Sequence, residues 1–250
     1  MGAITERSIM LSFSTPYFAH RGLHQGHSAA PENSLAAFSL AVRRGFGIEL
    51  DVRRTADDAL VVFHDSSLIR VCGQKGTIEE MTLEEIRRAP LYDSGQKIPL
   101  FSEVLDLVHG QVPLLVEIKM EGVDPKLCEL TAKALDGYGG AYCVESFHPY
   151  ALYWFRRNRP LVPRGQLVTD FFRECPSMPR WQKWLMKPLI SNVWTRPNFF
   201  SLDRRYRNTL FFRFLAAHRP VFGWTFRSEE EMQAAKGAFD AYIFEQRPSS

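Results

Sequence analysis

The sequence has 250 residues, enough for one large α/β barrel or for two small domains. Hydrophobic residues make up 45% and charged residues 24%, as in soluble globular proteins, and a net charge of +3 is too small to indicate nucleic-acid binding. No run of about 18 apolar residues occurs, so no transmembrane helix is expected. The four cysteines lack metal-type spacing, which predicts reduced thiols and a cytoplasmic location.

Short apolar runs alternate with amphipathic stretches along the chain. The first helix is predicted over residues 33–45, with Asn33 as its N-cap. Eight strands alternating with helices are typical of a (β/α)8 TIM barrel. A doubly wound sheet fits less well because no glycine-rich phosphate loop follows a strand. The predicted strands are residues 17–22, 47–52, 113–119, 141–147, 164–170, 198–203, 220–226 and 240–245.

A ninth apolar run, residues 59–65, breaks this alternation. It follows the strand at 47–52 too closely for a parallel crossover, which needs about a dozen residues or more. The two runs are therefore expected to pair antiparallel as a β-hairpin. With the turn at residues 56–59, Asp51 faces His64, so the hairpin brings a histidine beside the carboxylates of the second strand.

The barrel is expected to resume only after an insertion. Residues 66–99 do not continue the alternation of strands and helices, although TLEEIRR predicts a short helix within them. We interpret residues 1–250 as a single barrel domain that carries this insertion before its third barrel strand.

Carboxylates occur in two neighbouring strands of the predicted barrel. Because side chains alternate along a strand, Glu49 and Asp51 point to one face, and Glu117 and Lys119 share a face in the same way. Burying neighbouring carboxylates without a cation is costly. Three carboxylates with no cysteine nearby suit a hard divalent cation, so Mg²⁺ or Ca²⁺ is expected between Glu49, Asp51 and Glu117.

Two histidines and two cationic side chains are expected at the same end of the barrel, because TIM barrels carry their chemistry at the carboxyl ends of the strands. His20 ends the first strand and His64 ends the hairpin, and histidines can act as general acid and base near neutral pH. Arg21 and Lys119 supply positive charge for an anion such as phosphate. Each residue alone is commonly structural, but together they indicate phosphoryl-ester chemistry.

The stretch AHRG…PENSLAAFSLAVRRGFGIELDVRRTADDALVVFHD resembles the glycerophosphodiester phosphodiesterase family. The resemblance continues through PLLVEIK and GWTFRSEEEM and covers residues 17–248. It implies a (β/α)8 barrel in which His20 and His64 are the acid/base pair and the metal ligands are Glu49, Asp51 and Glu117. It also implies that the residues in contact with substrate or phosphate are Arg21, Lys119, Glu32 and Trp224.

The resemblance implies hydrolysis of a small-molecule glycerophosphodiester to sn-glycerol 3-phosphate and an alcohol, with one divalent cation, Mg²⁺ or Ca²⁺. Either histidine could be the acid, and the nucleophile could be water or the neighbouring glycerol hydroxyl. The alternatives are lysophospholipase D-type hydrolysis in the same site and a non-catalytic phosphate-binding barrel.

Two segments depart from the family pattern. Glu245 ends the last strand where many members have an Asp. The connection at residues 171–197 is long and aromatic, and we expect it to set substrate preference. Trp181, Trp184, Leu185 and Pro188 lie there on one face of a predicted short helix. That face either covers the barrel or forms a lip that contacts the acyl tail and headgroup of a lipid.

Overall fold

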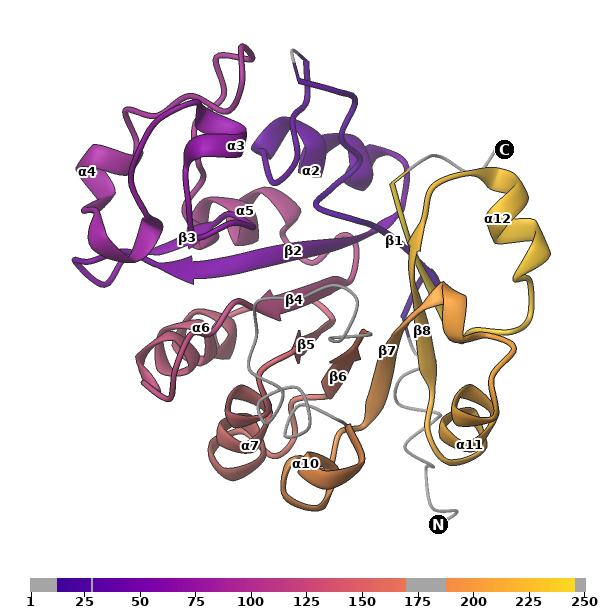
Figure 1. Cartoon of the computed structure of the whole chain (residues 1–250). Helices are drawn as coiled ribbons and strands as arrows, with labels where there is room; N and C mark the ends of the chain where they lie inside the picture. Colours follow the sequence, from indigo (N-terminus) through magenta and orange to yellow (C-terminus); the bar gives the residue numbers. More distant parts are fainter. Residues whose placement is uncertain (1–12, 28, 170–187, 246–250) are drawn as a thin grey trace.

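The computed structural model describes residues 13–27, 29–169 and 188–245. In this part of the chain, eight parallel strands form a closed barrel (Figure 1), because β1 pairs with β2 on one side and with β9 on the other. The predicted (β/α)8 TIM barrel is thereby confirmed. The strands are β1 (Tyr17–Ala19), β2 (Gly47–Arg54), β4 (Leu114–Ile118), β5 (Tyr142–Ser146), β6 (Arg164–Val168), β7 (Phe199–Asp203), β8 (Val221–Phe226) and β9 (Ala241–Phe244).

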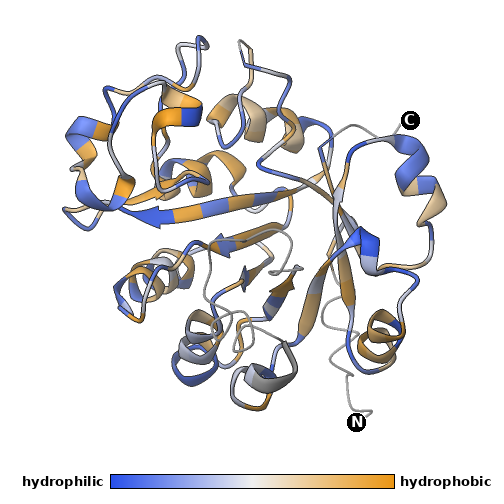
Figure 2. Cartoon of the chain, viewed as in Figure 1, coloured by the Kyte–Doolittle hydropathy of each residue, from blue (hydrophilic) through white to orange (hydrophobic). Residues whose placement is uncertain are grey.

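Helices surround the barrel, and the strands at its centre are predominantly apolar (Figure 2). One of these helices, α5, buries the apolar side chains Phe101, Val104, Leu105 and Val108 on one face. None of the helices in the described residues combines the length and apolar character that crossing a bilayer requires. The surrounding elements are α2 (Leu35–Arg43), α5 (Phe101–Val108), α6 (Lys126–Asp136), α7 (Pro149–Asn158), α10 (Pro188–Thr195), the 3-10 turn η2 (Arg204–Tyr206), α11 (Leu210–His218) and α12 (Glu229–Ala234).

One end of the barrel interior is filled by apolar side chains. Phe18, Phe199 and Phe222 stack there, with ring centroids 4.5 Å apart for Phe199 and Phe222. The close approach of Phe199 requires Gly165 on the next strand, since a Cβ there would lie 2.1 Å from the ring. This apolar plug leaves the carboxyl ends of the strands for polar groups.

The hairpin forms as predicted, but its register differs by one residue. β3 (Leu60–Val62) pairs antiparallel with β2, and the backbone N–H of Phe63, not of His64, donates to the carbonyl of Asp51 at 2.9 Å. The loop has three residues because Asp58 adopts φ +64° and Thr55 N–H donates to the Ala59 carbonyl at 2.9 Å. The predicted pairing of Asp51 with His64 is therefore wrong, and His64 lies just beyond the paired strands.

Residues 66–99 contain α3 (Ile69–Cys72), η1 (Ile78–Glu80) and α4 (Leu83–Ile86). The short helix predicted at TLEEIRR is α4, which Thr82 and Glu85 close with a capping box. The segment has an apolar cluster of its own, built mainly from Leu68, Val71, Ile78, Ile86, Leu91 and Ile98. This cluster includes Val61 and Phe63, so the segment is anchored on the hairpin.

Two expectations concern connecting segments: one is corrected by the structure, and the other falls mostly on residues outside the described ranges. Asn33 was expected to cap α2, but the cap is Ser34, whose hydroxyl accepts the Ala37 N–H at 3.1 Å. Asn33 is thereby free to adopt φ +53° and to turn its side chain toward the barrel. Of the aromatic connection at 171–197, residues up to 187, with Trp181, Trp184 and Leu185, lie outside the described residues.

Candidate active site

A polar pocket of about 200 Å³ opens at the carboxyl ends of the strands. Of the nine residues that the sequence points to, seven line it, namely His20, Arg21, Glu49, His64, Glu117, Lys119 and Trp224. The other two, Asp51 and Glu32, lie behind the lining and bind its cationic side chains. The structure therefore assembles residues from both ends of the sequence in one cavity.

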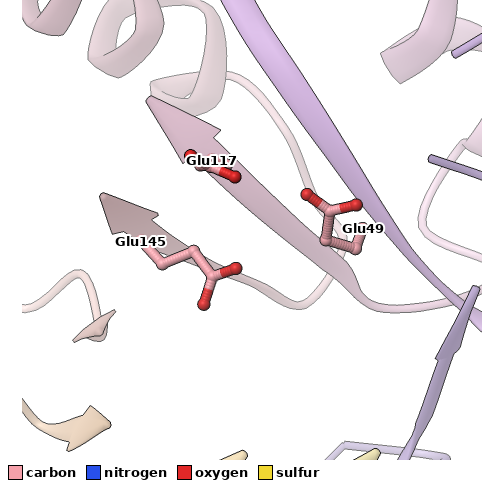
Figure 3. Close-up of side chains that lie close together, drawn as sticks. All are labelled: Glu49, Glu117 and Glu145. Atoms are coloured by element: carbon pink, nitrogen blue, oxygen red, sulfur yellow. The ribbon is translucent and has the colours of Figure 1, made fainter. Parts of the chain in front are cut away.

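Three buried carboxylates meet at the floor of the pocket. Glu49, Glu117 and Glu145 come from β2, β4 and β5, and each offers an oxygen within 4.8 Å of the others (Figure 3). Their exposed fractions are 2%, 6% and 1%. Burial, followed by the charges of neighbouring carboxylates, raises the pKa of both Glu49 and Glu145 well above the usual value.

A hard divalent cation fits this trio. Glu145 Oε2 is buried and has no hydrogen-bond partner in the described part of the chain. A buried carboxylate oxygen without a partner is costly, and a cation would remove that cost together with the mutual repulsion. Carboxylate oxygens are the ligands that Mg²⁺ and Ca²⁺ prefer.

Glu145 was missed in the sequence, although a signal for it existed. It lies inside the apolar run AYCVESF, where a carboxylate is as unexpected as Glu49 is in its own strand. What places it in the site is the parallel register of β4 and β5, in which Glu145 is directly opposite Glu117. Register between separate strands is not written in a local pattern.

Asp51 lies beside the trio rather than within it. Its Oδ1 is 3.1 Å from Lys119 Nζ, and its Oδ2 accepts a hydrogen bond from Asn33 Nδ2 at 2.8 Å. Burial by itself raises the pKa of Asp51, but the charges of Lys119, His64 and Arg21 outweigh it and hold that pKa well below the usual value. Lys119 also lies 2.7 Å from Glu117 Oε1, so one ammonium bridges two carboxylates. The predicted role of Asp51 as a metal ligand stays a prediction.

His20 follows β1 and is held from behind by a carboxylate. Its Nδ1 lies 3.1 Å from Glu245 Oε1, at the end of β9, and its Nε2 lies 3.9 Å from Glu49 Oε2. A carboxylate on Nδ1 favours the tautomer that leaves Nε2 free toward the pocket. Burial lowers the pKa of His20 to about 4, against an opposing contribution from Glu245. The hydrogen bond from His20 in turn lowers the pKa of Glu245 to about 2.

His64 has the same kind of support from its own neighbour in the sequence. Its Nδ1 lies 2.6 Å from Asp65 Oδ1, and its side chain is 31% exposed, whereas that of His20 is 16% exposed. The two histidines therefore reach the pocket from different elements, and a carboxylate engages Nδ1 of each. The contacts of Asp65 with His64 and of Glu245 with His20 are visible only in the structure.

Arg21 is fixed in the pocket by its backbone and by its side chain. With φ +54°, its N–H donates to Glu49 Oε2 at 2.9 Å. Its guanidinium donates to Glu32 Oε1 at 2.7 Å, and its Nε lies 3.6 Å from Asp51 Oδ2. Burial by itself lowers the pKa of Arg21, but these carboxylates outweigh it and raise that pKa above the usual value. Glu32 thus acts on the pocket through Arg21.

Apolar side chains also line the pocket. Trp224 and Phe147 form an edge-to-face pair with ring centroids 5.9 Å apart, and the indole Nε1 of Trp224 is buried with no hydrogen-bond partner among the described residues. We call this group the apolar wall, formed by Phe147, Leu167, Trp224 and Ile243. We call another group of lining residues, formed by His20, Arg21, Glu49, Glu117 and Lys119, the ionic wall.

Comparison with known proteins assigns the chain to one family. The model of the glycerophosphoryl diester phosphodiesterase family matches residues 20–243. A glycerophosphodiester phosphodiesterase of Bacillus altitudinis is 31% identical over 172 residues, which is 64% of this chain and 69% of that protein. Glycerophosphodiester phosphodiesterase 1 of Bos taurus is 44% identical over 198 residues, which is 74% of this chain and 56% of that protein.

A solved structure shares the fold. A phosphodiesterase of Oleispira antarctica, in complex with the product sn-glycerol-3-phosphate, superposes with a TM-score of 0.76 at 22% identity, covering 92% of both chains. At that identity the likeness supports the barrel alone.

Proposed function

The chain belongs to the glycerophosphoryl diester phosphodiesterase family of phosphoric diester hydrolases, and on that premise we propose that it cleaves glycerophosphodiesters to sn-glycerol 3-phosphate and an alcohol. The observation that carries the proposal is the meeting of three buried carboxylates with two histidines, each supported at Nδ1 by a second carboxylate. The product sn-glycerol-3-phosphate bound to the Oleispira antarctica phosphodiesterase, which shares the barrel fold, is in line with this proposed reaction.

We propose that the two histidines divide the proton transfers. One Nε2 takes a proton from the attacking hydroxyl, either of water or of the neighbouring glycerol, as its oxygen bonds to phosphorus. The other imidazolium gives its proton to the alcohol oxygen as the bond from phosphorus to that oxygen breaks. Glu245 and Asp65 support these transfers because a carboxylate at Nδ1 orients each ring and stabilises its charged form.

Arg21 and Lys119 are proposed to hold the phosphate. Both line the pocket, and both already face carboxylates, so an incoming phosphate would meet two cations whose positions are fixed. Such preorganised charge stabilises the negative charge that develops on the phosphoryl oxygens.

We propose that one divalent cation, Mg²⁺ or Ca²⁺, binds at the carboxylate trio. Glu49 and Glu117 belong both to the ligand set predicted from the sequence and to the cluster in the structure, and Asp51 and Glu145 are the candidates for a further position. When bound, the cation would supply electrophilic stabilisation of phosphoryl charge. The chain's own contribution is to keep these oxygens buried and close together and to leave Glu145 Oε2 without a hydrogen-bond partner among the described residues.

Hydrolysis of glycerophosphocholine tests the proposal directly. We expect turnover with Mg²⁺ or Ca²⁺, loss of turnover in EDTA, and sn-glycerol 3-phosphate as the phosphorus-31 NMR product. A transient cyclic phosphate in rapid-quench samples would identify the glycerol hydroxyl as the nucleophile. Glu49→Gln should abolish metal-dependent turnover, whereas the matched change Glu84→Gln on the exposed surface should not.

The alternatives have distinct outcomes in this assay. Turnover of lysophospholipids in place of glycerophosphocholine would indicate lysophospholipase D-type activity. No turnover of any glycerophosphodiester or lysolipid with any divalent metal would leave a phosphate-binding barrel. A cytoplasmic location is also part of the proposal, and the scattered spacing of the four cysteines supports it.

A further inference from the structure

An ion-pair network connects the segment at residues 66–99 to the pocket, and Arg70 in α3 is its centre. On one edge of the guanidinium, Nη1 and Nη2 donate to the two oxygens of Glu32, each at 2.8 Å. On the other edge, Nε and Nη2 donate to the two oxygens of Asp65 at 2.6 Å and 3.1 Å. Arg70 thus forms two bidentate pairs, which the single ammonium of lysine cannot reproduce.

Each of these carboxylates also holds a residue that lines the pocket. Asp65 Oδ1 lies 2.6 Å from His64 Nδ1, and Glu32 Oε1 accepts a hydrogen bond from Arg21 Nη1 at 2.7 Å. Burial by itself raises the pKa of Glu32, but the hydrogen bonds and charges of Arg70 and Arg21 outweigh it and lower that pKa to about 2. A single carboxylate therefore connects Arg70 to His64 on one side, and another connects it to Arg21 on the other.

Tyr92 strengthens the network from the far end of the same segment. Its hydroxyl accepts a hydrogen bond from Arg70 Nη1 at 3.1 Å and donates to Glu32 Oε2 at 3.3 Å. Its ring stacks on His27, with centroids 3.9 Å apart and an angle of 5° between the planes. The segment therefore contacts the loop after β1 at both Glu32 and His27.

The arrangement of Arg70 exceeds what folding of the segment requires. The apolar cluster of the segment contains Leu68, Val71 and Cys72 but not Arg70, whose side chain is 44% exposed. An exposed arginine usually contributes little to stability. Arg70 nevertheless directs all five of its N–H groups at two carboxylates and one hydroxyl beside the pocket.

We propose that Arg70 is a positioning residue for the reaction, which orients His64 through Asp65 and Arg21 through Glu32. The proposal rests on the proposed function for the roles of His64 and Arg21. It gives the segment at residues 66–99 a task in the site, namely to hold an acid/base residue and a phosphate-binding residue in one rigid frame.

Arg70→Gln tests the proposal by removing both bidentate pairs. We expect kcat for glycerophosphocholine to fall about 10- to 100-fold, as for other residues that orient groups of a site, with a melting temperature close to that of the wild type. Arg70→Lys should recover only part of the loss, because it restores the charge and not the two pairs. Arg88→Gln is the matched control, since Arg88 lies in the same segment and pairs with Glu84 on the exposed surface.

A second readout is independent of turnover. The short hydrogen bond between His64 and Asp65 should give a downfield imidazole proton signal, assigned by its loss in His64→Gln. We expect this signal to shift or broaden in Arg70→Gln and to stay unchanged in Arg88→Gln. If the His64 signal is unchanged in Arg70→Gln, the proposal is wrong. If Arg70→Gln does not fold, Arg70→Lys takes its place, and a wild-type signal together with wild-type kcat in that variant would overturn the proposal. If the wild-type protein shows no turnover, only the proposed function is contradicted. The positioning of His64 by Arg70 is still tested by the imidazole proton signal.

Discussion

The ionic and the apolar wall of the pocket come from different parts of the barrel and differ in what holds them. Residues of the ionic wall lie on or directly after β1, β2 and β4. Neighbouring charged side chains hold them in place, as Glu245 holds His20 and Asp51 holds Lys119. The apolar wall, from β5, β6, β8 and β9, is built by ring contacts and burial, as in the pair of Phe147 and Trp224. Its Leu167 is only 4% exposed.

This difference separates the reaction from the choice of substrate. Charge that develops on a phosphoryl group can be stabilised by the ionic wall but not by the apolar wall, because aliphatic and aromatic side chains provide no compensating charge. The apolar wall can discriminate only by area and shape, and discrimination of that kind is weaker. Changes in the ionic wall should therefore affect turnover with every substrate, whereas changes in the apolar wall should affect the ratio between substrates.

The largest effects are expected from the histidines. His20→Ala and His64→Ala should each lower kcat by about 10²- to 10⁴-fold with every substrate, the usual contribution of a positioned acid or base. The double variant should lose less than the product of the two, since the pair acts as a unit. These effects are measured as steady-state kcat values with two glycerophosphodiesters that differ in their alcohol group. Near-wild-type turnover in either single variant would remove that histidine from the mechanism.

A large effect is also expected on stability in acid. Burial lowers the pKa of His20 from 6.5 to about 4, so the unfolded chain binds this proton first. The stability that this contributes is complete above pH 6.5 and is lost as the pH falls toward 4, in total about 3 kcal/mol at ~1.4 kcal/mol per pKa unit. Urea unfolding in EDTA, from pH 7 to pH 4, is the measurement.

His20→Gln provides the control, because the other titrating groups of the ionic wall remain. Its unfolding free energy should fall less between pH 6.5 and 4 than that of the wild type. Parallel curves for the two proteins would show that His20 is not held in its neutral form by burial.

A smaller effect on metal binding separates the candidates for the ligand set. Glu117→Gln should weaken the binding of Mg²⁺ or Ca²⁺ by at least about 10-fold, the lower end for residues that merely support ligands. Excess metal should restore part of the turnover. Calorimetric titration of Glu145→Gln and Asp51→Asn then shows which carboxylate joins Glu49 and Glu117. Wild-type affinity in Glu117→Gln would rule out a site at the trio.

The smallest effect is expected in the apolar wall. Leu167→Val removes one CH₂ group from the pocket and should change the ratio of kcat/KM between an apolar and a polar alcohol group by about fourfold, from ~0.8 kcal/mol per CH₂. Leu202→Val is the matched control, because Leu202 is also buried but belongs to the core between strands and helices. Equal ratios in both variants would show that Leu167 does not face the alcohol.

Much of the site follows from local patterns in the sequence. The spacing of Glu49 and Asp51 predicts that both face the barrel interior, since side chains alternate along a strand. The short link before residues 59–65 predicts an antiparallel hairpin, since a parallel crossover would not fit. Both predictions hold in the structure. They depend only on the geometry of neighbouring residues, which tertiary packing does not alter.

Other features were decided only when the strands and loops came together. Glu145 enters the carboxylate trio because β5 aligns in parallel with β4, and the register of two separate strands depends on packing along their whole length. Glu245 reaches His20 across 225 residues, and Arg70 reaches Glu32 across 38. Even within the hairpin, the left-handed conformation of Asp58 shifted the pairing by one residue.

The sequence by itself therefore determined the barrel, the end of it that carries the chemistry, and the residues that local alternation directs there. The tertiary structure decided which carboxylate supports which histidine and which carboxylates lie close enough to share a cation. The reason is physical: alternation along a strand is set by the backbone of that strand, whereas an ion pair between distant residues exists only once the barrel has closed and brought the two side chains together.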